Sequence, residues 1–209
     1  EMSMNKAVRR VLLSIVLMIV VLFIYTLWDN NRIKVVNQEI LIENLPDDLD
    51  GFKIVQVTDL HEKEFGENQG RLIKKINSID YDTIVFTGDM LISGSSRNYQ
   101  PFYSLIEAIN NKDHALYVPG NSDPSSYVVN GKKHLKKHEF IEGMEARGVK
   151  LLESIYTVEE GSFNIQIIDF ELSTLDPQKR AAIPTEVKSS LYAQHQNQLL
   201  AEMSKLDSA

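Results

Sequence analysis

The chain has 209 residues and a mass of 23.8 kDa, enough for one domain of ordinary size plus a further segment, which excludes two full catalytic domains. Hydrophobic residues make up 43% and charged residues 24% of the sequence, so the chain can bury a core and is not a low-complexity or disordered sequence. The absence of cysteine excludes disulfides, thiolate zinc sites and cysteine nucleophiles, and leaves oxygen and nitrogen as metal ligands. The formal charge of -7 argues against nucleic-acid binding as a main role.

The first feature along the chain is an uncharged apolar segment from Val11 to Trp28. A helix of this length nearly crosses the hydrocarbon core of a bilayer, so the segment predicts a transmembrane anchor at residues 11–28. A cleaved signal peptide is the main alternative, but the apolar stretch is longer than a usual signal core, and residues 29–32 contain no small-residue cleavage site. An uncleaved anchor is therefore the favoured prediction.

The charges beside the segment predict its orientation. Lys6, Arg9 and Arg10 precede it, and cytoplasmic flanks of membrane helices carry the excess of basic residues. We therefore expect a cytoplasmic N-terminus at residues 1–10, a single-pass anchor in the cell membrane, and a domain over residues 32–209 outside the cytoplasm.

Strand and helix patterns alternate after the anchor. Residues 32–42 alternate and are rich in Val and Ile, which predicts an extended run. Short apolar runs predict strands and helical spacing predicts helices in this order: strand 52–58, helix 67–79, strand 82–87, helix 101–109, strand 115–118 and helix 139–147. This order predicts an α/β fold with a parallel sheet covered by helices on both faces.

The rhythm changes after the third helix. Strand patterns at residues 150–152, 156–158 and 164–168 lie close together, with Gly161 between the last two, which is typical of a hairpin. A final helix is expected from Pro184 to Leu206.

Polar motifs follow three of the predicted strands. They are Asp59-Leu60-His61, Gly88-Asp89 and Gly120-Asn121-Ser122-Asp123. Loops at the carboxyl ends of parallel strands converge, so these side chains are expected to share one site. Asp59 and His61 can bind one cation, Asp89 is placed to bridge two cations, and the Asn121 carbonyl can bind the second. Each motif alone is weak, since a helix cap or turn explains it equally well, but together and in this order they predict a metal site.

These motifs resemble those of the calcineurin-like metallophosphoesterases, in particular their membrane-anchored bacterial branch. The resemblance runs from about Ile40 to Val158, through the phrases FKIVQVTDLHEKEFG, DTIVFTGDML and LYVPGNSD. It implies a layered α-β-β-α sheet structure, of which this chain would hold a part. It also implies hydrolysis of phosphomonoesters or phosphodiesters, with a metal-bound hydroxide as the nucleophile.

The resemblance implies roles for individual residues. Asp59, His61, Asp89 and Asn121 would bind two divalent ions, which the donor set leaves open as manganese, iron or zinc. Asp89, Asn121, Ser122 and Asp123 are the catalytic candidates. The expected partners are a phosphate-ester substrate and, through the N-terminal helix, the membrane.

Two departures from the family pattern give a second hypothesis. The family has a histidine at the position of Ser122, and serine is no general acid near neutral pH. No glycine-histidine-x-histidine loop follows Ile168, so we expect this chain to be the N-terminal portion of a longer enzyme. The alternative function is a catalytically impaired, membrane-tethered metal-binding or regulatory domain.

The other histidines have simpler interpretations. His195 is expected to be a solvated helix residue, and His134 and His138 belong to a solvated basic stretch. His114 precedes a strand and has no evident partner in the sequence.

Overall fold

The computed structural model describes residues 5–129, 135–169, 194–195, 197–199 and 201. The chain divides into two compact units, Glu1–Ile40 and Leu41–Ala209.

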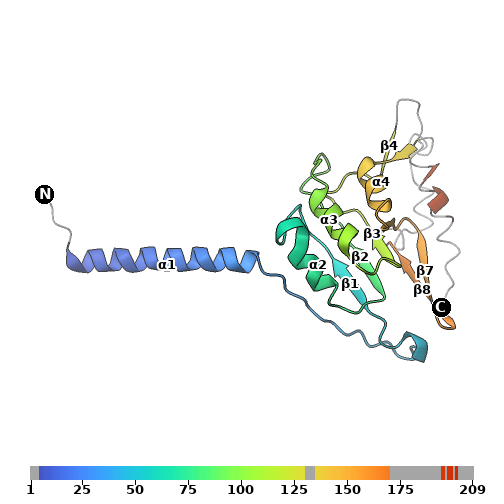
Figure 1. The fold of residues 1–209 in the computed structure, drawn as a ribbon, viewed down its shortest axis with the longest axis horizontal. Helices are drawn as coiled ribbons and strands as arrows, with labels where there is room; N and C mark the ends of the chain where they lie inside the picture. The colour runs from blue at the N-terminus through green and yellow to red at the C-terminus, as the bar shows by residue number, and fades with distance from the viewer. Residues whose placement is uncertain (1–4, 130–134, 170–193, 196, 200, 202–209) are drawn as a thin grey trace, which may run out of the picture. The chain divides into compact units, whose positions relative to one another are not determined.

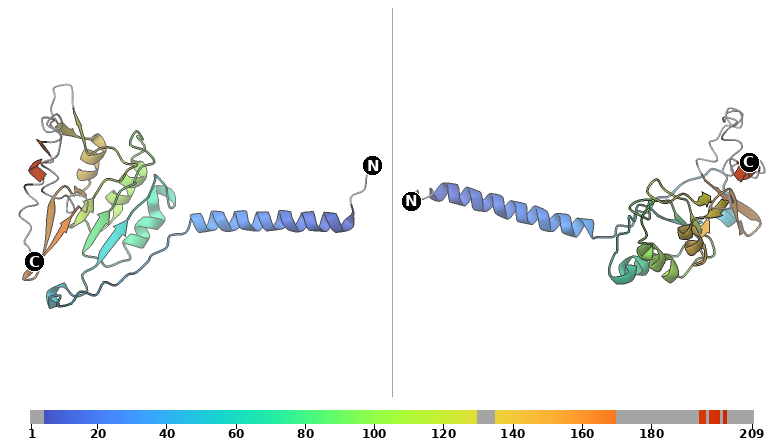
Figure 2. Two further views of the ribbon diagram at one scale, coloured as in Figure 1. Left: turned by 180° about the vertical axis from the view of Figure 1, so that it is seen from behind. Right: turned by 90° about the horizontal axis from the view of Figure 1, so that it is seen from above.

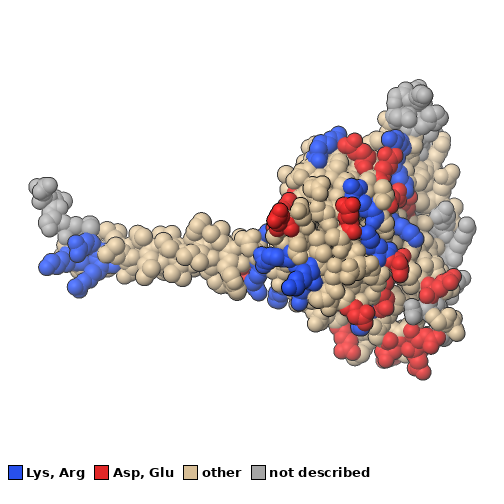
Figure 3. Space-filling view, viewed as in Figure 1, with Lys and Arg blue, Asp and Glu red and all other residues tan. Residues whose placement is uncertain are grey.

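The first unit contains one long helix, α1 (Lys6–Asn30), which begins where the Asn5 side chain accepts a hydrogen bond from the Ala7 N–H (3.0 Å). The hydroxyl of Ser14 donates to the Arg10 carbonyl (3.1 Å), so this polar group is satisfied inside the helix. By length and composition α1 fits a membrane span or a signal sequence. Figure 3 shows basic side chains at its N-terminal end and an uncharged surface along its middle.

The segment after α1 differs from the sequence prediction. Residues 32–42 form no strand, and the side chains of Val36 and Ile40 are 73% and 75% exposed. An alternating pattern forms a strand only where a neighbouring strand accepts its backbone hydrogen bonds, and none pairs with this segment among the described residues. A short 3₁₀ helix, η1 (Asp47–Leu49), follows it.

The second unit is built on a four-stranded parallel sheet in the order β1-β2-β3-β6 (Figure 1). Its strands are β1 (Ile54–Val57), β2 (Thr83–Phe86), β3 (Ala115–Tyr117) and β6 (Lys150–Leu151). The connecting helices are η2 (Glu67–Gln69), α2 (Gly70–Ile76), α3 (Gln100–Ala108) and α4 (Glu139–Glu145). The predicted α/β class with a parallel sheet is confirmed, although each strand is shorter than the apolar run that predicted it.

Helices α2, α3 and α4 cover one face of this sheet (Figures 1 and 2). The core between the layers is aromatic, because Phe102 of α3 packs edge-on against Phe86 of β2 (centroids 5.2 Å apart) and also contacts Phe140 of α4 (5.7 Å). All three rings are fully buried. Burial of such rings is the main favourable contribution to packing of this layer.

The opposite face of the sheet carries none of the helices α2, α3 and α4. Ile54 on this face is 55% exposed, and α2, α3 and α4 lie on the other side. A cavity of about 450 Å³ lies here, lined by Ile54, Val85, Thr87, Leu116, Val118, Pro119, Leu152, Ile167, Ile168 and Asp169. Successive side chains of a strand point to opposite faces of the sheet, so the apolar runs place apolar residues on this face as well. This alternation accounts for the exposed Ile54 and for the apolar lining of the cavity.

Two antiparallel hairpins complete the described part of the unit. β4 (Tyr127–Val129) pairs with β5 (Leu135–Lys137), and β7 (Ile155–Glu160) pairs with β8 (Phe163–Ile168). The second hairpin confirms the strand pattern around Gly161. Of the helix expected at 184–206, residues 194–195, 197–199 and 201 are helical, and the rest lies outside the described residues.

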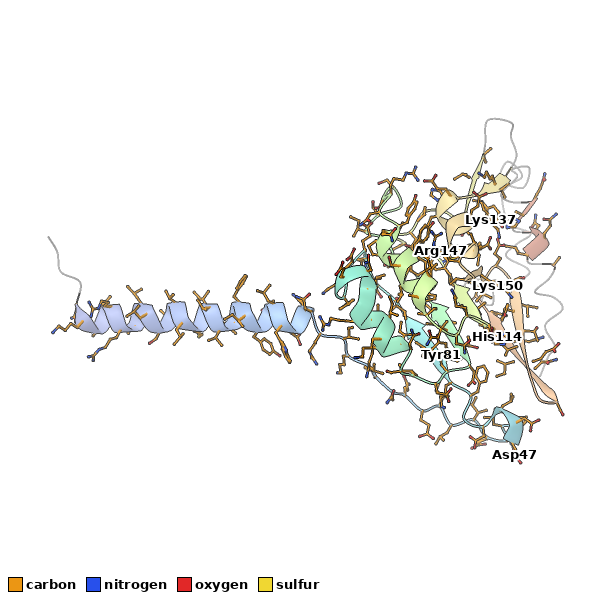
Figure 4. The ribbon with its side chains drawn as sticks, viewed as in Figure 1. Asp47, Tyr81, His114, Lys137, Arg147 and Lys150 are labelled. Atoms are coloured by element: carbon orange, nitrogen blue, oxygen red, sulfur yellow. The ribbon has the colours of Figure 1, made fainter. Side chains whose placement is uncertain are left out.

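Polar side chains form hydrogen bonds between the segments that precede the strands, at the amino-terminal ends of the sheet. Asp82 accepts a hydrogen bond from the Lys53 N–H (2.7 Å), and the hydroxyl of Tyr81 donates to the Asn111 carbonyl (2.8 Å). His114 Nδ1 lies 3.0 Å from the Tyr156 hydroxyl, so this histidine has the partner that the sequence did not reveal. Tyr81 and His114 are labelled in Figure 4.

Candidate metal centre

The loops after β1 and β2 are joined by backbone hydrogen bonds beyond the ends of the strands. The Asp59 N–H donates to the Gly88 carbonyl (3.1 Å), and the His61 N–H donates to the Asp89 carbonyl (2.9 Å). The aspartate–histidine motif and the glycine–aspartate motif therefore stay paired, as the convergence of strand ends predicts.

The backbone is strained at these motif residues. Asp59, His61 and Asp89 have positive φ values of 54°, 46° and 56°. The left-handed region costs about 1–2 kcal/mol for a residue with a side chain and is concentrated at functional sites. The hydrogen bonds between the two loops hold this conformation, which turns the three side chains toward one another. The sequence gives little sign of this, since aspartate and histidine only tolerate such a backbone.

Three potential ligand side chains come together here. Asp59, His61 and Asp89 each offer one ligand atom, and these atoms all lie within 4.8 Å of one another. His61 Nε2 is 3.5 Å from Asp59 Oδ1 and 3.9 Å from Asp89 Oδ2. Two carboxylates and an imidazole at these separations can converge on one divalent cation.

Neighbouring groups orient these ligands. His61 Nδ1 lies 3.2 Å from the Leu91 carbonyl oxygen, so a proton on Nδ1 is donated to that carbonyl and Nε2 is left free to bind a metal. The Thr58 hydroxyl donates to Asp59 Oδ2 (2.7 Å), which leaves Asp59 Oδ1 on the side of His61. The donor set and its orientation therefore fit a divalent metal ion.

The loop after β3 contacts this cluster through Ser122. Its backbone N–H donates to Asp89 Oδ1 (2.8 Å), while Asp89 Oδ2 is the oxygen nearer His61. Asn121 is exposed on the same loop, and Asp123 is only 8% exposed. The structure thus joins Asp59, His61 and Asp89 in one cluster and places Asn121, Ser122 and Asp123 on the adjoining loop.

Glu62 is a site neighbour that the motifs did not single out. Its carboxylate accepts hydrogen bonds from the Ile92 N–H (3.1 Å) and the Asn98 side chain (3.0 Å), so it anchors the serine-rich loop after Asp89 beside the cluster. Although burial acts to raise it, hydrogen bonds from Ser96, Ile92 and Asn98 hold the pKa of Glu62 below its usual value. Its position directly after His61 is the sequence feature from which Glu62 could have been identified as a neighbour of the site.

Two further histidines differ from their predicted solvated roles. His138 is half-buried, and its Nδ1 accepts a hydrogen bond from the Phe140 N–H (3.2 Å), so it caps the start of α4. His195 is also half-buried and pairs with Glu153 (3.1 Å). His134 lies outside the described residues.

A parallel α/β sheet whose strand-end loops gather two carboxylates and an imidazole defines a metal-binding α/β domain. The family model of calcineurin-like phosphoesterases matches residues 52–202. The match covers more than half of the chain, so the chain belongs to this family, as the resemblance predicts.

One curated relative is an uncharacterized metallophosphoesterase of Bacillus subtilis (strain 168), YkuE. It is 34% identical to this chain over 86 residues, which are 40% of this chain and 30% of the relative. The match therefore spans less than a third of that protein's length.

Proposed function

We propose that the chain is a metal-dependent phosphoric ester hydrolase acting on a phosphomonoester or phosphodiester. The convergence of Asp59, His61 and Asp89 at the carboxyl edge of the sheet is the observation that carries the proposal. In it, two divalent ions, manganese, iron or zinc, occupy the site. Asp59 and His61 would hold the first ion, Asp89 would serve both ions, and Asn121 would hold the second.

The side chains of this chain have distinct tasks in the proposal. His61 presents Nε2 because Nδ1 faces the Leu91 carbonyl. Asp89 can serve two ions because the Ser122 N–H holds one of its oxygens while the other faces His61. When bound, the ions supply Lewis acidity that activates water and neutralises the charge on the phosphoryl oxygens.

Ser122 sets the expected leaving-group preference. Its hydroxyl can donate a hydrogen bond to an ester oxygen, but it carries no charge and does not release a proton near neutral pH. We infer that the site favours esters whose leaving groups depart without protonation.

The membrane topology is part of the proposal. Residues 1–10 lie in the cytoplasm, residues 11–28 cross the membrane, and the domain over residues 32–209 acts outside. The basic residues before the apolar stretch of α1 support this orientation. A reporter enzyme that works only outside the cytoplasm, fused after Ala209, should be active, whereas activity of a cytoplasm-only reporter at that position refutes the orientation.

A tethered metal-binding or regulatory domain without turnover is the second candidate. The observation that favours it is the size of the ligand cluster. Among the described residues, the group of His, Asp and Glu side chains able to hold a metal has three members. Such a site can bind an ion without completing the coordination of two.

The two candidates are separated by an assay of the full chain in detergent. The purified protein is loaded with Mn²⁺ and offered bis(p-nitrophenyl) phosphate and p-nitrophenyl phosphate, beside the variants Asp89→Asn and Asp82→Asn. Asp82 is a matched control because its carboxylate also accepts a backbone N–H, but at the opposite edge of the sheet. We expect Asp89→Asn to lower hydrolysis about 100-fold or more and Asp82→Asn to leave it unchanged. Wild-type hydrolysis no faster than that of Asp89→Asn refutes the enzyme proposal.

A further inference from the structure

A buried carboxylate lies behind the ligand cluster. Asp123 Oδ1 accepts a hydrogen bond from the Leu91 N–H (3.0 Å), and Oδ2 accepts one from the Gly120 N–H (3.0 Å). The residue is 8% exposed. Burial of a carboxylate is costly unless its oxygens are hydrogen-bonded, and here each oxygen is bonded to a different loop.

Tyr117 lies against the same carboxylate from the core. It is fully buried, and its hydroxyl has no hydrogen bond of good geometry among the described residues. Burial and then the charge of Asp123 raise the pKa of Tyr117, so the hydroxyl keeps its proton. The Tyr117 hydroxyl therefore adds no second negative charge beside the Asp123 carboxylate.

The two residues that donate backbone hydrogen bonds to Asp123, Leu91 and Gly120, lie close to groups that orient candidate metal ligands. Leu91 donates its N–H to Asp123, and its carbonyl faces His61 Nδ1. Gly120 begins the loop in which the Ser122 N–H holds Asp89 Oδ1. Asp123 therefore binds Leu91, which orients His61, and also the loop that orients Asp89.

We propose that Asp123 is a positioning residue that fixes the loops after β2 and β3, so that His61 and Asp89 face the same ion. This inference rests on the proposed function and deepens it. In this role Asp123 acts through the backbone N–H groups of Leu91 and Gly120, which its two oxygens bind, and not through direct contact with metal or substrate.

The test is the Mn²⁺ affinity of the full chain in detergent, measured by calorimetry and by the electron paramagnetic resonance signal of free Mn²⁺. In Asp123→Asn one carboxylate oxygen becomes an amide nitrogen, so either the Leu91 or the Gly120 N–H faces a donor. We expect Mn²⁺ binding to weaken about 10–100-fold, as for other partners of metal ligands. The control Asp82→Asn, which changes a backbone-bonded carboxylate at the opposite edge, should bind Mn²⁺ like the wild type.

The outcomes are distinct. Asp123→Asn that is less stable but binds Mn²⁺ with unchanged affinity overturns the inference, because a merely structural carboxylate affects stability alone. If Asp123→Asn does not fold, Asp123→Glu keeps the charge and both acceptor oxygens but moves them away from the Leu91 and Gly120 N–H groups. This variant should also weaken Mn²⁺ binding, and unchanged affinity in it overturns the inference.

Failure of the proposed function appears elsewhere in the same data. A wild type that binds Mn²⁺ but hydrolyses neither ester contradicts the enzyme proposal while the effect of Asp123 remains measurable. A wild type that binds no Mn²⁺ overturns both.

Discussion

The backbones of Gly88 and Gly120 touch at the base of the candidate metal centre. A Cβ atom on Gly88 would overlap the backbone nitrogen of Gly120, and a Cβ atom on Gly120 would overlap the backbone nitrogen and side chain of Asp89. Gly88 also has a φ of +87°, whereas Gly120 has no positive φ. The lack of a side chain at both glycines therefore allows the loops after β2 and β3 to approach each other. At Gly88 the positive φ is a second reason for glycine, because other residues rarely adopt it.

We predict that alanine at either glycine damages the metal centre. Gly88→Ala and Gly120→Ala should each destabilise the domain by about 1–3 kcal/mol through overpacking, with a further contribution at Gly88 from its backbone conformation. Because the overlap involves the ligand loops, Mn²⁺ binding should weaken in both variants. Denaturant unfolding and Mn²⁺ titration measure the two effects.

The chain provides matched controls for these glycines. Gly51 has a φ of +80° with open space around it, so Gly51→Ala should cost about 1 kcal/mol and leave Mn²⁺ binding unchanged. Gly70 has neither feature, and Gly70→Ala should be neutral or stabilising. Equal effects of Gly51→Ala and Gly120→Ala on Mn²⁺ affinity would contradict the close-approach argument.

Removal of metal should abolish hydrolysis and leave the fold intact. The ligand loops are held by the Asp59–Gly88 and His61–Asp89 backbone hydrogen bonds, which need no ion. We expect treatment with EDTA to stop turnover, Mn²⁺ to restore it, and the far-ultraviolet circular dichroism spectrum to stay the same. At Mn²⁺ about 100 times above Kd, mass action should stabilise the domain by about 2.7 kcal/mol, seen as a higher Tm. Loss of the circular dichroism signal on chelation would mean that the ion is needed to form the loops.

The convergence of three candidate ligand side chains could be predicted because each belongs to a motif that follows a strand. Asp59, His61 and Asp89 could be placed together from order alone, because parallel strands deliver their carboxyl ends to one edge. Asp123 could be named from its motif as a catalytic candidate, but its hydrogen bond from the Leu91 N–H could not be predicted, because Leu91 lies 32 positions away in the chain. Such contacts depend on tertiary packing, which local patterns do not encode.

The fold also has features that local sequence patterns predict and features that depend on tertiary packing. The sheet and the β7–β8 hairpin follow from apolar runs and Gly161, which are local signals. Residues 32–42 also carry an alternating pattern but pair with no strand among the described residues, and Ile54 is 55% exposed on the sheet face opposite α2, α3 and α4. A local apolar pattern indicates that a segment tends to form a strand or to be buried. Whether another strand or a helix packs against that segment depends on distant parts of the chain.

Replacement of Ser122 tests the inferred leaving-group preference. A histidine at this half-buried position would supply the imidazole that the family pattern has there, and a positioned general acid contributes about 10²–10⁴-fold to rate. Ser122→His should therefore speed hydrolysis of alkyl phosphate esters by about tenfold or more and change p-nitrophenyl esters little, since nitrophenolate leaves without a proton. The measurement is kcat for a series of esters of rising leaving-group pKa. An unchanged slope of rate against that pKa would show that Ser122 does not face the leaving group.

Tyr103 should make stability depend on pH in the alkaline range. Burial raises the pKa of Tyr103 to about 12, against the weaker opposite effect of Arg147, whose guanidinium lies 4.2 Å from the ring centroid. The hydroxyl also donates a hydrogen bond to the Phe140 carbonyl (2.9 Å). A tyrosine with a raised pKa in the folded state stabilises fully below the unfolded value of 10.0 and loses that contribution as the pH rises toward 12.

The variant Tyr103→Phe isolates this effect, because the other tyrosines remain in both proteins. Near pH 7 the variant should be less stable by about 1 kcal/mol through the lost hydrogen bond. Between pH 10 and 12 the wild type should lose up to about 2 kcal/mol more than the variant, so the difference closes or reverses. Urea unfolding of the full chain in detergent at several pH values measures both curves. Two curves that stay parallel up to pH 12 would mean that Tyr103 ionises equally easily in the folded and unfolded states.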